Sequence, residues 1–142
     1  MGRMPFWSVA LVAATSVHAG FQLTVTLLVY PALARVAPAE FTGAHARHSR
    51  AIVPLVGLVY GAALVAAVGA VVAAPQSGAA WLAALATGGA FGVTAFRAAP
   101  LHGRLGRRGP EATLVRALLR ADRVRTLLAL LAVVAALSHA LL

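Results

Sequence analysis

Four long apolar stretches dominate this chain of 142 residues and restrict what it can fold into. Hydrophobic residues make up 61% of the sequence and charged residues 11%, whereas a soluble domain carries about 25% charged residues. The stretches cover about 5–33, 52–74, 79–99 and 121–142. Stretches of this length suit helices that cross a hydrocarbon core about 30 Å thick. The sequence therefore predicts an all-α integral membrane four-helix bundle, forming a single domain over residues 1–142.

The absence of cysteine limits the chemistry that the chain can support. It excludes disulfides, thiolate metal sites, iron–sulfur clusters and a cysteine nucleophile. A bound metal or haem would need histidine, carboxylate or tyrosine ligands. The sequence leaves the cofactor open between none, a histidine-bound metal and haem.

Basic residues are concentrated in two of the connections between the apolar stretches. All twelve are arginines, and with three acids they give a formal net charge of +9. Every arginine except Arg3 lies in or beside the first or third connection. The positive-inside rule then predicts a protein of the inner (plasma) membrane with its basic loops in the cytoplasm and both termini on the non-cytoplasmic side. Lipid headgroups, and not nucleic acid, are the expected counter-ions.

Prolines mark the expected helix ends. Pro38 and Pro110 are typical of helix starts, and the helix from Pro38 is expected to run through residues 40–50 into the second span and to bend near Pro54. Pro100 is expected to end the third span. For the first stretch, a cleavable signal peptide is the alternative, but the uninterrupted length of the apolar run favours a membrane span.

Glycines at a spacing of four predict where helices approach closely. The pairs are Gly57 with Gly61 in the second span and Gly88 with Gly92 in the third. Such pairs let helix backbones pack against each other in a membrane. The alternative is that they arise by chance in a sequence rich in alanine and glycine.

Polar residues within the first span follow one helical face. Thr15, His18, Gln22, Thr26 and Tyr30 are three or four residues apart and are expected to face the protein interior. An ionisable side chain at bilayer depth is a functional candidate. The structural alternative for His18 is a neutral imidazole that is hydrogen-bonded to a neighbouring helix.

A second face carries two histidines at the loop end of the second span. Phe41, His45, His48 and Ile52 are spaced four, three and four residues apart. His102, just after Pro100, is expected at the same end of the bundle. These histidines can act as acid–base groups or as metal ligands, although a zinc site needs three or four ligands. The alternative is a solvated interfacial face.

Asp122 and Arg125 are spaced to form an ion pair at the start of the fourth span. A purely structural pair is the alternative to a catalytic Asp122. Arg97 can extend to headgroups or hold an anionic or carbonyl group of a ligand. The sequence thus predicts a pocket open to the cytoplasmic side, with catalytic residues His45, His48, His102 and Asp122, metal ligands His45, His48 and His102, and substrate-binding residues His18, Gln22, Tyr30, Tyr60, Arg97 and Arg125.

Taken together, these positions resemble the small four-helix membrane proteins related to anthrone oxygenases. The residues that carry the resemblance are His18-Ala-Gly-Phe-Gln22, Tyr30-Pro31, Glu40-Phe41, His45-x-x-His48-Ser49, Pro54, Tyr60, Pro100-Leu-His102 and Asp122-Arg123-x-Arg125. Members of that group linked to polyketide pathways oxidise anthrones to anthraquinones. The resemblance implies an oxidoreductase or oxygenase that acts on a lipophilic aromatic or quinone-like molecule, with His45, His48 and His102 at its site.

Other functions stay open at this point. A haem- or metal-binding redox protein would use His18 and one of His45, His48 or His102 as axial haem ligands. A non-catalytic scaffold would use its arginine-rich face to recruit a partner or anionic lipid. The expected partners are membrane lipid and a lipophilic small molecule, and a homo-oligomer stays open.

Overall fold

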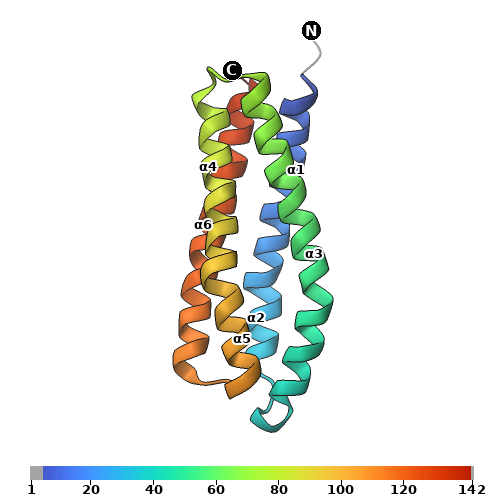
Figure 1. The fold of residues 1–142 in the computed structure, drawn as a ribbon, viewed down its shortest axis with the longest axis vertical. Coiled ribbons are helices and arrows are strands. Elements are labelled where there is room, and N and C mark those ends of the chain that lie inside the picture. The colour runs from blue at the N-terminus through green and yellow to red at the C-terminus, as the bar shows by residue number, and fades with distance from the viewer. Residues whose placement is uncertain (1–4, 142) are drawn as a thin grey trace.

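The computed structural model describes residues 5–141 as four long helical segments that run side by side (Figure 1). The first segment joins α1 (Phe6–Thr24), the π-helical turn η1 (Val25–Val29) and α2 (Tyr30–Ala34). The second is α3 (Pro38–Ala73). The third joins α4 (Gly78–Val93), the π-helical turn η2 (Thr94–Ala98) and α5 (Ala99–Arg108), and the fourth is α6 (Ala112–Leu141). All four are long and apolar enough to cross a membrane, which confirms the all-α four-helix class.

The two ends of the bundle differ in what they contain. The start of α1, the end of α6 and the turn between α3 and α4 lie at one end, here called the terminal end (Figure 1). The α2–α3 and α5–α6 connections lie at the opposite end, here called the loop end (Figure 1). Helices α1 and α4 each pack against both α3 and α6, so α1 and α4 are diagonal neighbours.

Apolar residues cover the outside of the bundle, as a lipid environment requires. Leu58 and Leu85 are each 69% exposed and Leu127 is 67% exposed. In water such surfaces would be unfavourable, because burial of apolar area is the main driving force of folding. The outward leucines therefore support the assignment of these helices to a membrane.

The interior is built from small residues at the terminal end and larger ones at the loop end. The terminal-end cluster consists of Leu11, Ala67, Ala70, Ala80, Ala83, Ala135 and Ala136. The loop-end cluster consists of Val25, Tyr30, Phe41, Ala98, Leu105, Leu114 and Leu118. Small side chains let helices approach closely.

Both π turns end two residues before a proline, η1 before Pro31 and η2 before Pro100. The Tyr30 N–H bonds to the Val25 carbonyl and the Ala99 N–H to the Thr94 carbonyl, each five residues earlier. An interior proline removes a helical hydrogen bond and clashes with the carbonyl four residues before it. A π turn changes this register locally, and the helix continues beyond Pro100 to Arg108. The expectation that Pro100 ends the third span is wrong for this reason.

The predicted glycine contacts are also wrong. A Cβ added at Gly57, Gly61, Gly88 or Gly92 would meet no atom within 4 Å outside its own helix. These glycines face away from neighbouring helices, and alanines make the close approaches instead. The glycine that matters sterically is Gly69, where an added Cβ would overlap the Trp7 ring.

The orientation predicted from the arginine distribution can be tested with single cysteines, because the chain has no cysteine of its own. Gln76 lies in the exposed turn between α3 and α4, and Arg107 lies at the exposed end of α5. A membrane-impermeant maleimide added to intact cells is expected to label Gln76→Cys and not Arg107→Cys. Labelling of Arg107→Cys alone would reverse the predicted topology.

Candidate functional site

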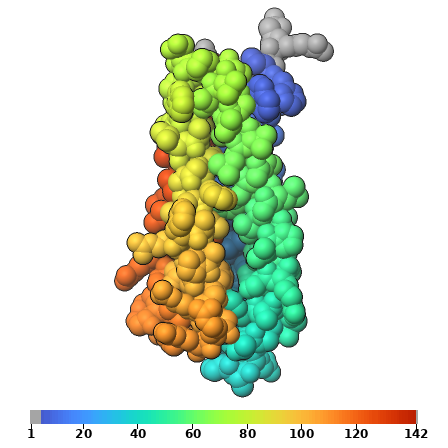
Figure 2. All heavy atoms as spheres, viewed as in Figure 1, coloured from blue at the N-terminus to red at the C-terminus, as the bar shows by residue number. Residues whose placement is uncertain are grey.

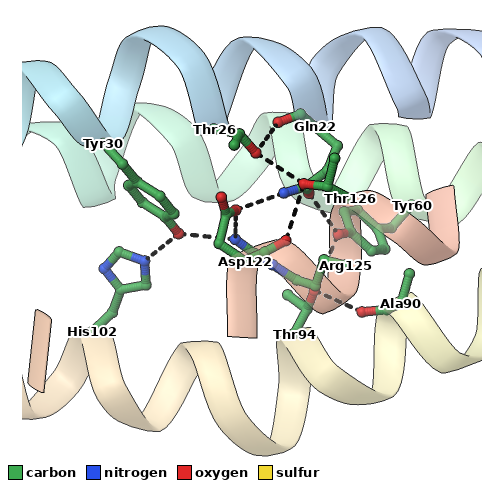
Figure 3. A network of polar contacts seen from close by, with 10 residues as sticks. All are labelled: Gln22, Thr26, Tyr30, Tyr60, Ala90, Thr94, His102, Asp122, Arg125 and Thr126. Atoms are coloured by element: carbon green, nitrogen blue, oxygen red, sulfur yellow. Dashed lines mark hydrogen bonds and ion pairs between the residues drawn. The ribbon is translucent and has the colours of Figure 1, made fainter. Parts of the chain in front are cut away.

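A buried ion pair within α6 forms the centre of a polar network (Figure 3). Arg125 Nη2 lies 2.8 Å from Asp122 Oδ1, and the exposed fractions of the two residues are 5% and 1%. Gln22 on α1 donates from Nε2 to the same carboxylate oxygen over 2.7 Å. The predicted ion pair at i and i+3 is confirmed, and Gln22 ties it to the neighbouring helix. This cluster thereby joins α1 to α6.

One branch of the network leads from Gln22 toward α3 and η2 (Figure 3). Tyr60 Oη donates to Gln22 Oε1 over 3.3 Å, and Thr94 Oγ1 lies 3.1 Å from Tyr60 Oη. Gln22 thus uses its amide nitrogen and its amide oxygen in different bonds. All four helical segments contribute to a single set of hydrogen bonds.

The other branch leads from Arg125 toward the loop end. Arg125 Nη2 donates to Tyr30 Oη over 2.9 Å, and Tyr30 Oη lies 3.2 Å from His102 Nε2. His102 Nδ1 lies 3.0 Å from His45 Nε2. Tyr30, His102 and His45 come from three different segments, α2, α5 and α3. The sequence prediction placed these residues at one end of the bundle, and the structure brings them into direct contact.

The protons of this branch have two self-consistent arrangements. A neutral imidazole donates from one nitrogen and accepts at the other. If Tyr30 donates to His102 Nε2, then His102 donates from Nδ1 to His45 Nε2. In the reverse arrangement His45 donates from Nε2 to His102, and His45 Nδ1 becomes a free acceptor. A switch between the two arrangements moves the shared proton between His102 Nδ1 and His45 Nε2.

A cavity of about 520 Å³, here called the site cavity, opens beside these groups. Figure 2 shows it as the hollow between α3 in teal and green and the orange third segment, with the blue first segment behind. Most of its wall is apolar, as in the small-molecule sites of other proteins. Its polar lining residues are Gln22, Tyr30, His45, His48, Ser49, Thr94, His102 and Arg125.

Both π turns contribute to the wall of the site cavity. Val25 comes from η1, and Thr94 and Ala98 come from η2. Single π turns in helices are often found at functional sites, because they redirect side chains. On α5, a Cβ added at Gly106 would lie 3.6 Å from His45 Nδ1. The glycine leaves this nitrogen uncovered on that side.

The structure separates Asp122, Tyr60 and Arg97 from this cavity and places His48 at its wall. Asp122 is buried beneath Arg125 and does not line the cavity, so it acts on the site through Arg125. Tyr60 also lies behind the wall and contacts it through Gln22. Arg97 faces a different groove, between the third segment and α6. His48 lines the cavity and is half-buried, with its ring centroid 6.3 Å from that of His102.

His18 is fully buried and lies apart from the other histidines. Its ring packs against Tyr60 with centroids 4.2 Å apart, and neither ring nitrogen has a hydrogen-bond partner among the described residues. Tyr60 and His45 are separated along α3 by about 22 Å at 1.5 Å per residue. Two axial ligands of one haem iron must lie within a few ångströms of it, so His18 and His45 are too far apart to form such a pair. His48 and His102 are the other second ligands predicted from the sequence.

The histidines of the site cavity are the residues nearest to a metal-binding arrangement. His45 and His102 are in direct contact, and His48 is on the same wall. Within residues 5–141, however, no group of three or more histidine or acidic residues is placed to hold a metal ion. The arrangement is better suited to hydrogen bonding and proton transfer.

Sequence reasoning overlooked two polar positions. Thr94 joins the network through Tyr60. The sequence feature that could have indicated Thr94 is its position as a lone hydroxyl near the end of an apolar span. His139 is the second of these positions, because Ser8 Oγ and Ser77 Oγ lie 3.2 and 2.8 Å from its two ring nitrogens. His139 thereby joins α1, the α3–α4 turn and α6 at the terminal end.

Comparison with models of protein families, with curated proteins and with solved structures finds no significant match to this chain.

The buried ion pair gives a stability prediction. Asp122→Asn keeps an acceptor for Gln22 and Arg125 but removes the negative charge, which leaves the Arg125 guanidinium uncompensated. We expect a loss of about 3–5 kcal/mol in unfolding free energy, as found when one partner of a buried pair is removed. Unfolding of the detergent-solubilised protein by a denaturing detergent measures it.

Arg123→Gln is the matched control, because Arg123 is exposed and lies on the same helix turn as Asp122. This substitution changes the net charge by the same amount as Asp122→Asn, with the opposite sign. The unfolding free energy of Arg123→Gln is expected to stay within about 0.5 kcal/mol of that of the parent protein. Joint replacement of Asp122 by Leu and Arg125 by Met should recover part of the loss. Equal stability of Asp122→Asn and Arg123→Gln would contradict the assignment.

Proposed function

We propose that this chain is a membrane-embedded oxidoreductase that oxidises a lipophilic aromatic molecule with molecular oxygen in the site cavity. The observation that carries the proposal is the hydrogen-bonded branch from Arg125 through Tyr30 and His102 to His45, which ends in an apolar cavity of about 520 Å³. The proposal retains the reaction class that the resemblance to anthrone oxygenases implies.

The cavity suits a substrate that carries an acidic methylene between aromatic or carbonyl groups. Val25, Ile52, Val53 and Val56 supply apolar walls, which favour a flat hydrocarbon body. Such a substrate dissolves in the bilayer and can enter sideways or from the loop end. Its acidic carbon needs only one well-placed base to form a stabilised carbanion.

His45 is the proposed base, through Nδ1. In the proton arrangement in which His45 Nε2 donates to His102, Nδ1 has a free lone pair. His102 then shares the positive charge that develops on His45, because the Nε2 proton of His45 can move to His102 Nδ1. A general base at hydrogen-bond distance of its proton contributes about 10²–10⁴-fold to a rate.

Arg125 and Tyr30 are proposed to stabilise the oxygen that becomes negatively charged when the substrate loses its proton. Arg125 lines the cavity and keeps its charge beside the buried Asp122 carboxylate. A fixed positive group in a site that excludes water stabilises an enolate more strongly than water does. Asp122 is a positioning residue in this scheme, since it contacts Arg125 and not the cavity.

The overall reaction balances with one molecule of oxygen. His45 takes the first proton from the methylene, and the carbanion transfers its electrons to oxygen, so that a carbon–oxygen bond forms. The resulting peroxide anion takes up that proton and becomes a hydroperoxide. The base then removes the second C–H proton, the oxygen–oxygen bond breaks, and the hydroxide that leaves takes up this second proton to form water. The net change is that a CH₂ group and O₂ become a carbonyl group and water.

Anthrone is a suitable probe, because its methylene is acidic and its product absorbs differently. The purified protein in detergent is expected to consume one O₂ per anthrone and to form anthraquinone faster than buffer and empty micelles do. His45→Ala and His102→Ala should each lower kcat by at least about 100-fold. An oxygen electrode and the absorption spectrum together measure this stoichiometry.

His139→Ala is the matched control, because it removes a hydrogen-bonded histidine at the opposite end of the bundle. Its turnover is expected to stay within a few fold of the parent protein. Under anaerobic conditions in D₂O, the parent protein should also exchange the methylene protons, and His45→Ala should not. Folded His45→Ala and His102→Ala proteins with unchanged rates would rule out the enzyme and favour a scaffold.

A further inference from the structure

A second cavity, of about 550 Å³, lies between the third segment and α6, and we call it the arginine groove. It shares no lining residue with the site cavity, although both use η2 and α5. Its basic residues are Arg97, Arg104 and Arg120. Its apolar lining includes Val93, Phe96, Pro100, Leu101 and Val124. A cationic rim joined to an apolar wall is the chemistry of a site for an anionic amphiphile.

Nothing within the described chain neutralises the three arginines. The one ion pair among residues 5–141 joins Arg125 to Asp122. The Asp122 oxygen in that pair already accepts from Gln22 and Arg125, and the carboxylate is buried on the other side of the helix from the groove. The remaining acids, Glu40 and Glu111, do not line the groove. A counter-ion for these arginines is therefore expected from outside the described part of the chain.

The three arginines line one groove at a spacing that suits the headgroup of an anionic lipid. Arg97 and Arg104 are two helical turns apart, about 10 Å along the axis. Arg120 faces them from α6 across the groove. Arginine side chains can form bidentate hydrogen bonds with phosphate, and their long apolar stems can lie along a hydrophobic surface while the charged group reaches the interface.

The groove also offers an apolar surface next to the charges. Phe96 is 81% exposed and Val124 45% exposed, and both are directed to the outside of the bundle. A free phosphate ion would leave this surface uncovered, whereas the acyl chains of a lipid would cover it. We propose that the arginine groove binds the phosphate of one anionic membrane phospholipid, with an acyl chain against Phe96 and Val124.

Lipid retention by the purified protein tests this proposal. The parent protein, in neutral detergent with added phosphatidylglycerol, is expected to retain one lipid per chain in native mass spectrometry. Joint substitution Arg97→Gln, Arg104→Gln and Arg120→Gln should weaken retention on the order of 100-fold, since each basic residue near an anionic lipid contributes about fivefold. Because all three side chains are exposed, the variant should keep its helical content by circular dichroism.

The matched control is Arg35→Gln, Arg47→Gln and Arg50→Gln, which removes the same charge at the same end of the bundle. It should retain phosphatidylglycerol like the parent protein. Equal losses in both triple variants, or equal retention of zwitterionic phosphatidylcholine by the parent protein, would overturn the proposal. Displacement of the lipid by millimolar inorganic phosphate would show a simple anion site and also overturn it.

Discussion

The buried Asp122–Arg125 pair is the constraint from which the rest of the structure follows. Charges at bilayer depth are tolerated when they are paired and hydrogen-bonded, and a buried pair with a missing partner is strongly destabilising. Here the carboxylate oxygen accepts from Gln22 as well as Arg125, and Arg125 also donates to Tyr30. To satisfy these groups, α1 and α6 must adopt one relative rotation and one register.

The remaining polar groups extend this requirement to the other segments. On one side of the ion pair, Tyr60 of α3 and Thr94 of η2 are hydrogen-bonded to the network. On the other side, His102 of α5 and His45 of α3 are hydrogen-bonded to it. The alanine-rich terminal end packs tightly, while the π turns and larger side chains of the loop end leave room for a cavity. The polar network stands at the boundary between these regions, and this position places its histidines at the cavity wall.

Much of this arrangement could be predicted from the sequence. The four spans follow from the apolar stretches, and the inward stripe of the first span follows from its spacing, since Thr15, His18, Gln22 and Tyr30 are all buried. The ion pair follows from its i and i+3 separation. These features depend on local periodicity, which a single sequence contains.

The features that could not be predicted depend on how helices rotate against each other. The sequence does not show that a π turn lets a helix continue through Pro100, because that depends on tertiary packing. The glycine pairs had the right spacing but the wrong face. Arg97 and His102 are close in sequence, yet they face two different cavities on the same helical segment. In each case the outcome depends on how a helix is rotated or continued against its neighbours, which the spacing of residues alone does not determine.

Detection of the hydrogen bond between His45 and His102 would test the proposed chemistry most directly. That chemistry depends on continuous hydrogen bonding from Arg125 to the site cavity. Nuclear magnetic resonance of the ¹⁵N-histidine-labelled protein can detect a coupling between two nitrogens across such a bond. We expect this coupling between His45 Nε2 and His102 Nδ1 in the parent protein, and its loss in His45→Ala. Two uncoupled imidazoles that titrate independently would contradict the proposed chemistry.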